Sequence, residues 1–331
     1  RSFSFSSPPT RADTPSGPGL PLPVTLGDMT EPLAMNVRGL FMGSGAGMAE
    51  PGMAELVIEL TGRAADGLEL LYLGTATYDR AEPRERQTHR FAELGCEVRT
   101  LEVATRDASV GELEESVARA DVVLASGGNT LYAVDRWTAL GLDEMLRAAI
   151  GRGVVACGGS AGAICWFDGG HSDSMDPTSY LEPVPAANPR ANEWRYIRVA
   201  GLGILPGLLC PHYGATQSNG VPRATDFRAM MRRHRDETGL GLDDWAGLLV
   251  DGDPYRVVHP DGREGSVRDG RFVDDGSGVP GLWLHEVVGD RVDVWLASTS
   301  GRLSDIVRPA RSIVDDSLVD AARRENPPRL A

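Results

Sequence analysis

Short apolar runs alternate with amphipathic segments between residues 37 and 157, and this alternation predicts successive strand and helix units. After the first run, apolar residues recur over Met53–Leu60 at the i, i+3, i+4 and i+7 spacing of a helix that buries one face. Strands that alternate with helices favour an α/β fold with a doubly wound, mostly parallel sheet. The predicted strands are 37–42, 68–74, 96–103, 121–128 and 153–157, and the predicted helices are 53–60, 83–94, 110–120 and 142–152.

The pattern changes after Trp194, where Val- and Leu-rich runs are separated by Asp-Gly, Gly-Asp and similar turns. Such pairs predict antiparallel hairpins over 247–258, 266–273 and 282–296, which extend or flank the main sheet. The last residues, 320–331, are charged and contain proline, so we expect this end to fray.

The first 27 residues are rich in Ser and Pro, nearly free of acidic residues, and without a helical or strand period. Such a composition cannot build a packed core, and it fits either a disordered tail or the remnant of an organelle transit peptide. We therefore divide the chain into a disordered or targeting segment over 1–34, a main domain over 35–258, and a hairpin extension with a C-terminal tail over 259–331. The extension is expected to pack on the main domain.

Composition narrows the classes of function. The 331 residues are 41% hydrophobic, which is enough for a sizeable core, and the formal charge of -14 would repel a phosphate backbone, so we expect no nucleic-acid partner. No apolar run approaches the 18 or so residues of a spanning helix, so we expect a soluble, cytoplasmic protein, with organelle import left open by the N-terminus. The four cysteines lack CxxC spacing, and Cys157 and Cys210 lie in apolar runs, so we expect buried thiols.

A G-x-S-x-G motif over Gly158–Gly162 follows the predicted strand 153–157, where a strand should pass into a helix. A nucleophilic serine at such an elbow takes a strained backbone conformation and needs small neighbours, which glycine and alanine supply. We therefore predict that Ser160 is a nucleophile. The alternative is a tight turn whose serine caps the next helix.

A second glycine-rich turn, Gly127-Gly128-Asn129, ends the preceding predicted strand. In a parallel sheet this turn lies beside the elbow, and glycines let backbone N–H groups approach a substrate. The amide of Gly127 or Gly128 could then form an oxyanion hole with the amide of Ala161. A plain helix start is the alternative.

His212 is the candidate base, because it follows the apolar run of "GILPGLLCPHYG" and so stands at the end of a predicted strand, facing the same sheet edge as Ser160. His171 lies in the predicted loop "GGHSDSMDP". The remaining histidines are expected to be surface or structural residues: His89, His234, His259 and His285.

The set "GGNT", "GGSAGA", "HSDS" and "CPHY", in this order, resembles the peptidase E family of α-aspartyl dipeptidases, whose relatives include cyanophycinases. The resemblance covers most of residues 37–258. It implies a fold like that of the class I glutamine amidotransferases and a Ser-His-acid triad, with Ser160 as nucleophile, His212 as base, and the amides near Gly128 and Ala161 as oxyanion hole. It also implies a serine-type dipeptidase that cleaves short peptides with an N-terminal aspartate through an acyl-enzyme.

The acid of this triad falls in the stretch "GHSDSMDP". Asp173 is our first choice and Asp176 the second, since either carboxylate could reach the far nitrogen of His212. If neither acts, Asp243 or Asp244 is the fallback. A metal cluster of His171 with Asp173 and Asp176 has no further ligand at metal spacing, so we expect no metal and no cofactor.

A substrate aspartate would need a cation or convergent amides, and Arg195, Arg198 and Arg223 are the candidates. One rival function is an α/β-hydrolase esterase, which would use His285 as base. A second rival is a cyanophycinase-like enzyme or a different serine acyl hydrolase, and a third is a pseudoenzyme that binds a peptide without cleaving it. A glutaminase is disfavoured because it would need a cysteine at position 160. The expected partner is a short peptide, without nucleic acid or membrane, and a homodimer stays open.

Overall fold

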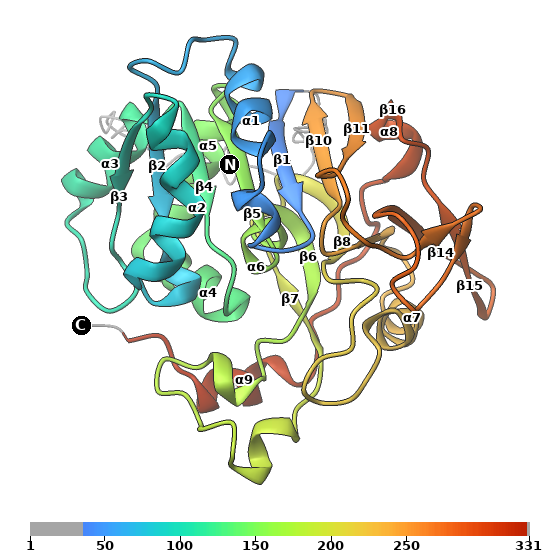
Figure 1. Cartoon of the computed structure of the whole chain (residues 1–331). Coiled ribbons are helices and arrows are strands. Elements are labelled where there is room, and N and C mark those ends of the chain that lie inside the picture. Colours follow the sequence, from blue (N-terminus) through green and yellow to red (C-terminus); the bar gives the residue numbers. More distant parts are fainter. Residues whose placement is uncertain (1–35, 330–331) are drawn as a thin grey trace, which may run out of the picture. The chain divides into compact units, whose positions relative to one another are not determined.

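The computed structural model describes residues 36–329, so the predicted N-terminal segment 1–34 lies outside the described residues (Figure 1). Within that range the strands form an eight-stranded, a six-stranded and a two-stranded sheet, and helices pack between and around them. The predicted α/β class with C-terminal antiparallel strands is confirmed. No helix in residues 36–329 is long and apolar enough to cross a membrane.

The eight-stranded sheet contains all five predicted parallel strands. Strands β1, β5, β4, β2 and β3 run parallel in this spatial order, and β10, β11 and β16 continue the sheet antiparallel beyond β1. In order across the sheet the strands are β16 (Ser300–Arg302), β11 (Pro254–Val258), β10 (Gly247–Asp251), β1 (Arg38–Met42), β5 (Val155–Gly159), β4 (Val122–Ala125), β2 (Glu69–Leu73) and β3 (Glu97–Thr100).

Helices cover both faces of this sheet, because alternate residues of each buried strand point to opposite faces. On β1, Leu40 and Met42 pack in the core beneath α1 and α2, whereas Phe41 faces the core that includes α3, α4, α5 and α6. Figure 1 shows α1 and α2 in front of the sheet. The helices are α1 (Met53–Thr61), α2 (Ala81–Glu93), α3 (Val110–Arg119), α4 (Thr130–Leu140), α5 (Leu142–Gly151), α6 (Ala161–Ile164), α7 (Arg223–Arg233), α8 (Leu303–Ile306) and α9 (Val319–Glu325).

The six-stranded sheet shares its core with the second face of the first sheet. Strands β6, β8 and β9 are parallel, and β7, β14 and β15 join them antiparallel. In order the strands are β15 (Arg291–Leu296), β14 (Leu282–Val288), β9 (Gly239–Leu242), β8 (Leu205–Cys210), β6 (Phe167–Ser172) and β7 (Ile197–Ala200). Its other face packs against α7.

This second sheet corrects one expectation. The strand that ends before His212 is β8, so His212 does not share a sheet edge with Ser160. The physical reason is the length of α6, which has four residues, whereas a crossover between parallel strands of one sheet needs a dozen or more. The chain therefore starts a new sheet at β6.

The three predicted hairpins are confirmed as β10–β11, β14–β15 and the short pair β12 (Val267–Arg268) with β13 (Arg271–Phe272). The expectation of a fraying C-terminus is wrong for residues 320–325, which belong to α9 (Val319–Glu325). This helix buries Val319 and Ala322 against β7, and the Arg323 guanidinium pairs with Asp135 on α4. Apolar burial outweighs the charged composition there.

Candidate active site

The chain reverses direction at Ser160, between the end of β5 and the start of α6. Ser160 has φ 57° and ψ −123°, a region that L-residues other than glycine rarely occupy, and its N–H donates to the carbonyl of Met42 on β1 at 3.0 Å. A strained serine between a strand and a helix is the geometry of a nucleophile elbow.

The glycines around Ser160 are required by close backbone contacts. A Cβ on Gly162 would lie 2.1 Å from the carbonyl oxygen of Ala125, one on Gly159 would lie 2.1 Å from that of Ser44, and one on Gly158 would lie 2.6 Å from that of Gly162. Real Cβ atoms do not approach a backbone oxygen this closely. The small residues of the motif therefore follow from packing at the turn.

His212 comes from the second sheet, two residues after β8, and also has a positive φ, 53°. Its N–H donates to the carbonyl of Gly43 at 3.2 Å, so the end of β1 holds the backbones of both Ser160 and His212. The Nε2 atom of His212 lies 2.8 Å from the Oγ atom of Ser160. This distance allows the serine hydroxyl to donate its proton to the imidazole.

Asp244 contacts the other ring nitrogen, since its Oδ1 lies 2.5 Å from Nδ1 of His212. Burial acts to raise the pKa of Asp244, but the hydrogen bond and charge of His212 outweigh it and lower that pKa. An ionised carboxylate can only accept a hydrogen bond, so it fixes the proton on Nδ1 and leaves Nε2 free to accept from Ser160. The three side chains form one hydrogen-bonded chain.

The two aspartates that the sequence favoured do not contact His212. The Asp173 carboxylate accepts from Arg223 at 3.2 Å and from Gln217 at 3.0 Å. The Asp176 carboxylate accepts from the N–H of Thr178, where it caps the 3-10 helix η4 (Pro177–Ser179). These contacts contradict both choices for the carboxylate on His212. The guanidinium of Arg223 and the amide of Gln217 hold the Asp173 carboxylate instead.

The sequence contains a pattern that favours Asp244 as the carboxylate on His212, although we ranked Asp244 below Asp173 and Asp176. It stands two residues beyond β9, just as His212 stands two residues beyond β8, and the two strands are parallel neighbours. Carboxyl ends of neighbouring parallel strands lie side by side. The positions that directly follow successive apolar runs therefore predict the residues around His212 better than the stretch "GHSDSMDP" does.

The neighbouring Asp243 anchors this loop to the hairpin extension. Its buried carboxylate accepts hydrogen bonds from the N–H and Oγ of Ser266 and from the N–H of Gly281. Burial raises the pKa of Asp243, and these three donors oppose the rise. On the other side, a Cβ on Gly43 would lie 1.9 Å from the carbonyl oxygen of Asp243, so β1 packs directly on the loop.

The predicted oxyanion residues lie beside Ser160. A Cβ on Gly127 would be 3.5 Å from Cβ of Ser160, and the N–H groups of Gly127, Gly128 and Ala161 make no hydrogen bond with another residue in the described range 36–329. Gly128 has φ 115°, which glycine tolerates. Asn129 instead caps α4, accepting from Tyr132, so its side chain has a structural role here.

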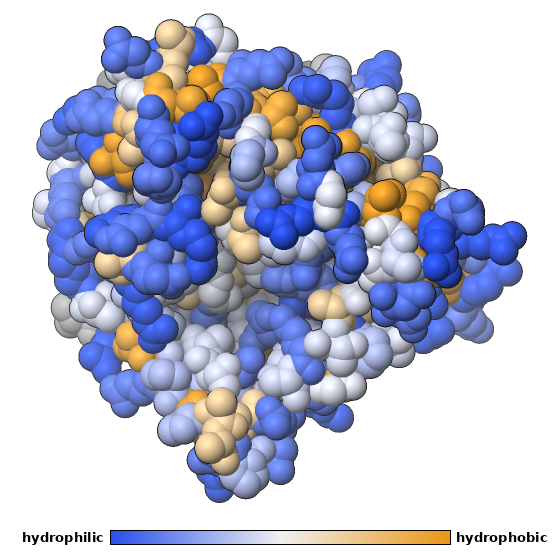
Figure 2. Space-filling model, in the orientation of Figure 1, coloured by the Kyte–Doolittle hydropathy of each residue, from blue (hydrophilic) through white to orange (hydrophobic). Residues whose placement is uncertain are grey.

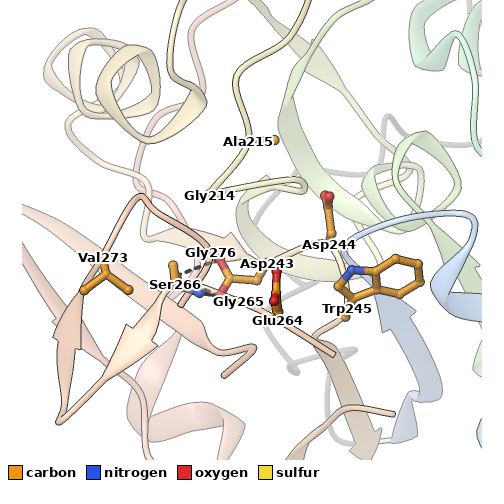
Figure 3. Close-up of a pocket in the computed structure, with 10 residues that line it drawn as sticks. All are labelled: Gly214, Ala215, Asp243, Asp244, Trp245, Glu264, Gly265, Ser266, Val273 and Gly276. Atoms are coloured by element: carbon orange, nitrogen blue, oxygen red, sulfur yellow. Dashed lines mark hydrogen bonds between the residues drawn. The ribbon is translucent and has the colours of Figure 1, made fainter. Parts of the chain in front are cut away.

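A pocket of about 210 Å³ adjoins Asp244 (Figure 3). The Asp244 and Trp245 side chains border it on one side, and the extension supplies Glu264 and Ser266 on the other. On the face shown in Figure 2, a shaded hollow lies near the centre, where Figure 1 places β5, α6 and β6. The further lining residues of the pocket are Gly214, Ala215, Asp243, Gly265, Val273 and Gly276.

The rival histidine and cysteine are both buried away from this chain of contacts. The Nε2 atom of His285 lies 3.0 Å from the hydroxyl oxygen of Tyr213 and is hydrogen-bonded to it, and burial lowers the pKa of His285 to about 3. Cys157 is fully buried on β5, and burial raises its pKa. All four cysteines are free and buried, as predicted.

His171 is not in a loop, as the sequence suggested, but on β6. It is fully buried, contacts the Asp226 carboxylate through Nε2 at 2.9 Å, and has a pKa that burial lowers to about 4. In residues 36–329 no group of three or more His, Cys, Asp or Glu side chains is placed to hold a metal ion.

An α/β fold with a serine at a strand-to-helix elbow, hydrogen-bonded to a histidine, is typical of serine acyl hydrolases. The family model described as Peptidase family S51 matches residues 40–258, which is more than half of the chain. The chain belongs to this family, and the protein is therefore a serine peptidase.

Relatives extend the comparison. A Trypanosoma brucei brucei protein named G2/mitotic-specific cyclin-1 is 26% identical over 91% of this chain and 97% of its own length. The Bacillus subtilis (strain 168) protein named Uncharacterized peptidase YgaJ is 33% identical over 54% of this chain and 67% of its own. The crystal structure of a peptidase from an acI-B1 Actinobacterium has the same fold, with a TM-score of 0.52 and 21% identity over 81% of this chain and 98% of that one.

Proposed function

We propose that the protein hydrolyses short peptides, dipeptides with an N-terminal aspartate among them, through a triad of Ser160, His212 and Asp244. The observation that carries the proposal is the continuous chain of contacts from Oγ of Ser160 to Nε2 of His212 at 2.8 Å and from Nδ1 to Oδ1 of Asp244 at 2.5 Å. Other serine hydrolases have the same contacts, in which the nucleophile meets the base and the base meets the orienting acid.

The acylation step follows from this order. Oγ of Ser160 attacks the peptide carbonyl carbon while its proton passes to Nε2 of His212, and Asp244 stabilises the imidazolium that forms. The tetrahedral intermediate then loses its C–N bond, and the imidazolium donates its proton to the leaving amine. Water attacks the resulting ester, with His212 first accepting a proton from that water and then returning a proton to Oγ.

Backbone N–H groups would stabilise the oxyanion. Those of Ala161 and of Gly127 or Gly128 have no partner in the described chain, and Gly127 packs on Ser160. Donors that are fixed before the reaction cost no reorganisation when the negative charge develops, and each is worth about 10²–10³ in kcat.

The aspartate preference rests on the resemblance to peptidase E. None of the three candidate arginines presents an unpaired guanidinium to Ser160: Arg198 is buried against Glu237, Arg223 is buried against Asp173, and Arg195 is exposed on another pocket, beside Trp194. Of the two unpaired backbone N–H groups at the turn 127–128, the one that does not serve the oxyanion is a donor available to a substrate carboxylate.

Labelling with a fluorophosphonate probe tests the nucleophile. The wild-type protein should be labelled at Ser160, and Ser160→Ala should abolish both labelling and peptide hydrolysis while leaving the circular dichroism spectrum unchanged, since alanine fits the elbow. A folded alanine variant that keeps more than about a hundredth of the wild-type kcat/KM would rule out this nucleophile, because loss of a triad serine costs about 10⁶. A wild-type pocket that never reacts would indicate a binding protein.

A pair of dipeptides tests the substrate. Asp-Leu should exceed Asn-Leu by about 30-fold to 1000-fold in kcat/KM, because a site built for a carboxylate leaves buried donors unpaired when an amide binds. Equal rates for the two dipeptides, or faster cleavage of a ten-residue peptide, would remove the aspartyl preference and leave the serine peptidase.

A further inference from the structure

Asp173 lies next to the proposed catalytic histidine although it does not touch it. Strands β6 and β8 are parallel neighbours with Gly170 opposite Leu209, so the same register places Asp173, just after β6, opposite His212, just after β8. The two side chains also interact electrostatically, since the charge of His212 helps to lower the pKa of Asp173. Asp173 therefore belongs to the edge where substrate must bind.

One oxygen of this carboxylate is fixed and the other is unused. Oδ2 accepts from Nη1 of the buried Arg223 at 3.2 Å and from Nε2 of Gln217 at 3.0 Å, whereas Oδ1 makes no hydrogen bond with another residue in 36–329. Burial acts to raise the pKa of Asp173, but the charges of Arg223 and His212 outweigh it and lower the pKa. The carboxylate is ionised and held in one orientation.

Gln217 supplies a second unused acceptor. A carboxylate only accepts, so the amide of Gln217 must direct its NH₂ group to Asp173, and its carbonyl oxygen Oε1 points elsewhere. That oxygen is buried and has no hydrogen-bond partner in the described chain. A buried acceptor without a donor costs about 1–3 kcal/mol, so a site that leaves one unpaired is suited to a ligand that donates.

A third unpaired group lies in the same cluster. The buried Tyr196 ring packs under the guanidinium of Arg223, with 4.9 Å between the guanidinium carbon and the ring centroid, and its hydroxyl has no partner in residues 36–329. Burial chiefly raises the pKa of Tyr196 to about 12, so the hydroxyl is neutral and able to accept a hydrogen bond.

The charges around this cluster favour a cation. The positive charge of Arg223 acts on both Asp173 and Asp244, so these two carboxylates share one guanidinium and one negative charge is left over. Asp226 lies in the field of Arg233 and Arg195, and buried His171 is neutral near pH 7, because burial lowers its pKa to about 4. A ligand with several N–H donors and a positive charge complements two unused acceptor oxygens in a negative field, and an anion does not.

We infer that Asp173 and Gln217 form the subsite for the free α-ammonium group of the substrate, which makes the enzyme select peptides by their unblocked N-terminus. This inference rests on the proposed peptidase function. In a dipeptide the ammonium nitrogen is bonded to the carbon next to the scissile carbonyl, so it must lie close to Ser160. Asp173 follows β6 and Gln217 lies in the loop after His212, so both belong to segments that begin where His212 meets Ser160.

The amine subsite also explains why a charged aspartate, rather than a hydrophobic residue, directly follows β6 beside His212. Acetylation of the substrate removes both its positive charge and two of its donors, so Asp173 would be desolvated without a partner. The expected penalty is about 10²–10³ in kcat/KM, the effect of losing one charged hydrogen bond in a closed site.

The test compares reactions with and without an amine. We would measure kcat/KM for Asp-Leu and for N-acetyl-Asp-Leu, together with the rate constant for fluorophosphonate labelling, in the wild type and in Asp173→Asn, Gln217→Leu and the control Asp176→Asn. Asp173→Asn should lower kcat/KM for Asp-Leu at least 30-fold more than the labelling rate, mainly through a higher KM. Gln217→Leu should do the same to a smaller degree, and the wild type should prefer Asp-Leu to its acetylated form at least 100-fold.

Two outcomes would overturn the inference. One is a wild type that cleaves both peptides equally well, and the other is a loss in Asp173→Asn that is equal for peptide and probe, which would mean that Asp173 acts only on the fold or on His212. Gln217→Leu, which leaves the Arg223 pair in place, keeps the test decisive if Asp173→Asn is unstable in thermal melting. Failure of the wild type to label would instead contradict the proposed peptidase function.

Discussion

Asp244→Asn tests which carboxylate orients His212. An asparagine at this position can turn its NH₂ group toward Nδ1, which moves the ring proton to Nε2 and removes the acceptor that Ser160 needs. In the best-studied serine protease triad this change costs about 10⁴ in kcat. The Asp244 side chain is 42% exposed, so water can replace part of its effect, and we expect a smaller loss, about 10²–10³. That loss corresponds to about 2.7–4.1 kcal/mol of transition-state stabilisation.

The assay for Asp244→Asn uses kcat/KM for Asp-Leu and the fluorophosphonate labelling rate. Both should fall together, because orientation of His212 is needed in either reaction, whereas the effect of Asp173→Asn should depend on the amine. The control Asp176→Asn, which removes the charge of the residue that caps η4 but keeps an oxygen that can accept from Thr178, should stay within about threefold of the wild type. If Asp244→Asn also stays within threefold while its melting temperature is unchanged, the acid role of Asp244 is refuted.

Further predictions concern stability. Gly162→Ala should lower the free energy of unfolding by about 3 kcal/mol or more in urea titrations, because its Cβ would meet a backbone oxygen at 2.1 Å, whereas Gly111→Ala in the open face of α3 should raise it by about 0.5–1 kcal/mol. Burial raises the pKa of Asp79 to about 6, so the wild type should lose up to about 3 kcal/mol as pH rises from 4 through 6, and Asp79→Asn should abolish that loss. Arg198→Met should lower the free energy of unfolding by about 3–5 kcal/mol, since it leaves the Glu237 carboxyl buried without its partner. Adding Glu237→Leu should recover most of this loss, and equal stability of the single and double variants would contradict the explanation.

The sequence alone determined the elements whose signals are local. The alternation from residue 37 predicted the five parallel strands of the first sheet, because a strand buried on both faces and an amphipathic helix each need their own apolar period. The G-x-S-x-G pattern predicted the elbow because the motif is contained in five residues, although the backbone oxygens that require Gly159 and Gly162 belong to Ser44 and Ala125. His212 was also found this way, because an apolar run of six residues ends just before it.

Tertiary structure decided which carboxylate meets His212. Asp173 and Asp244 both follow strands that neighbour β8, one on each side, so strand order places either near the histidine. The choice depends on Arg223, which reaches Asp173 from the start of α7, 50 residues along the chain, and holds its carboxylate away from His212. Competition between donors from distant segments leaves no periodic signal in sequence, because it is a property of packing and charge in three dimensions.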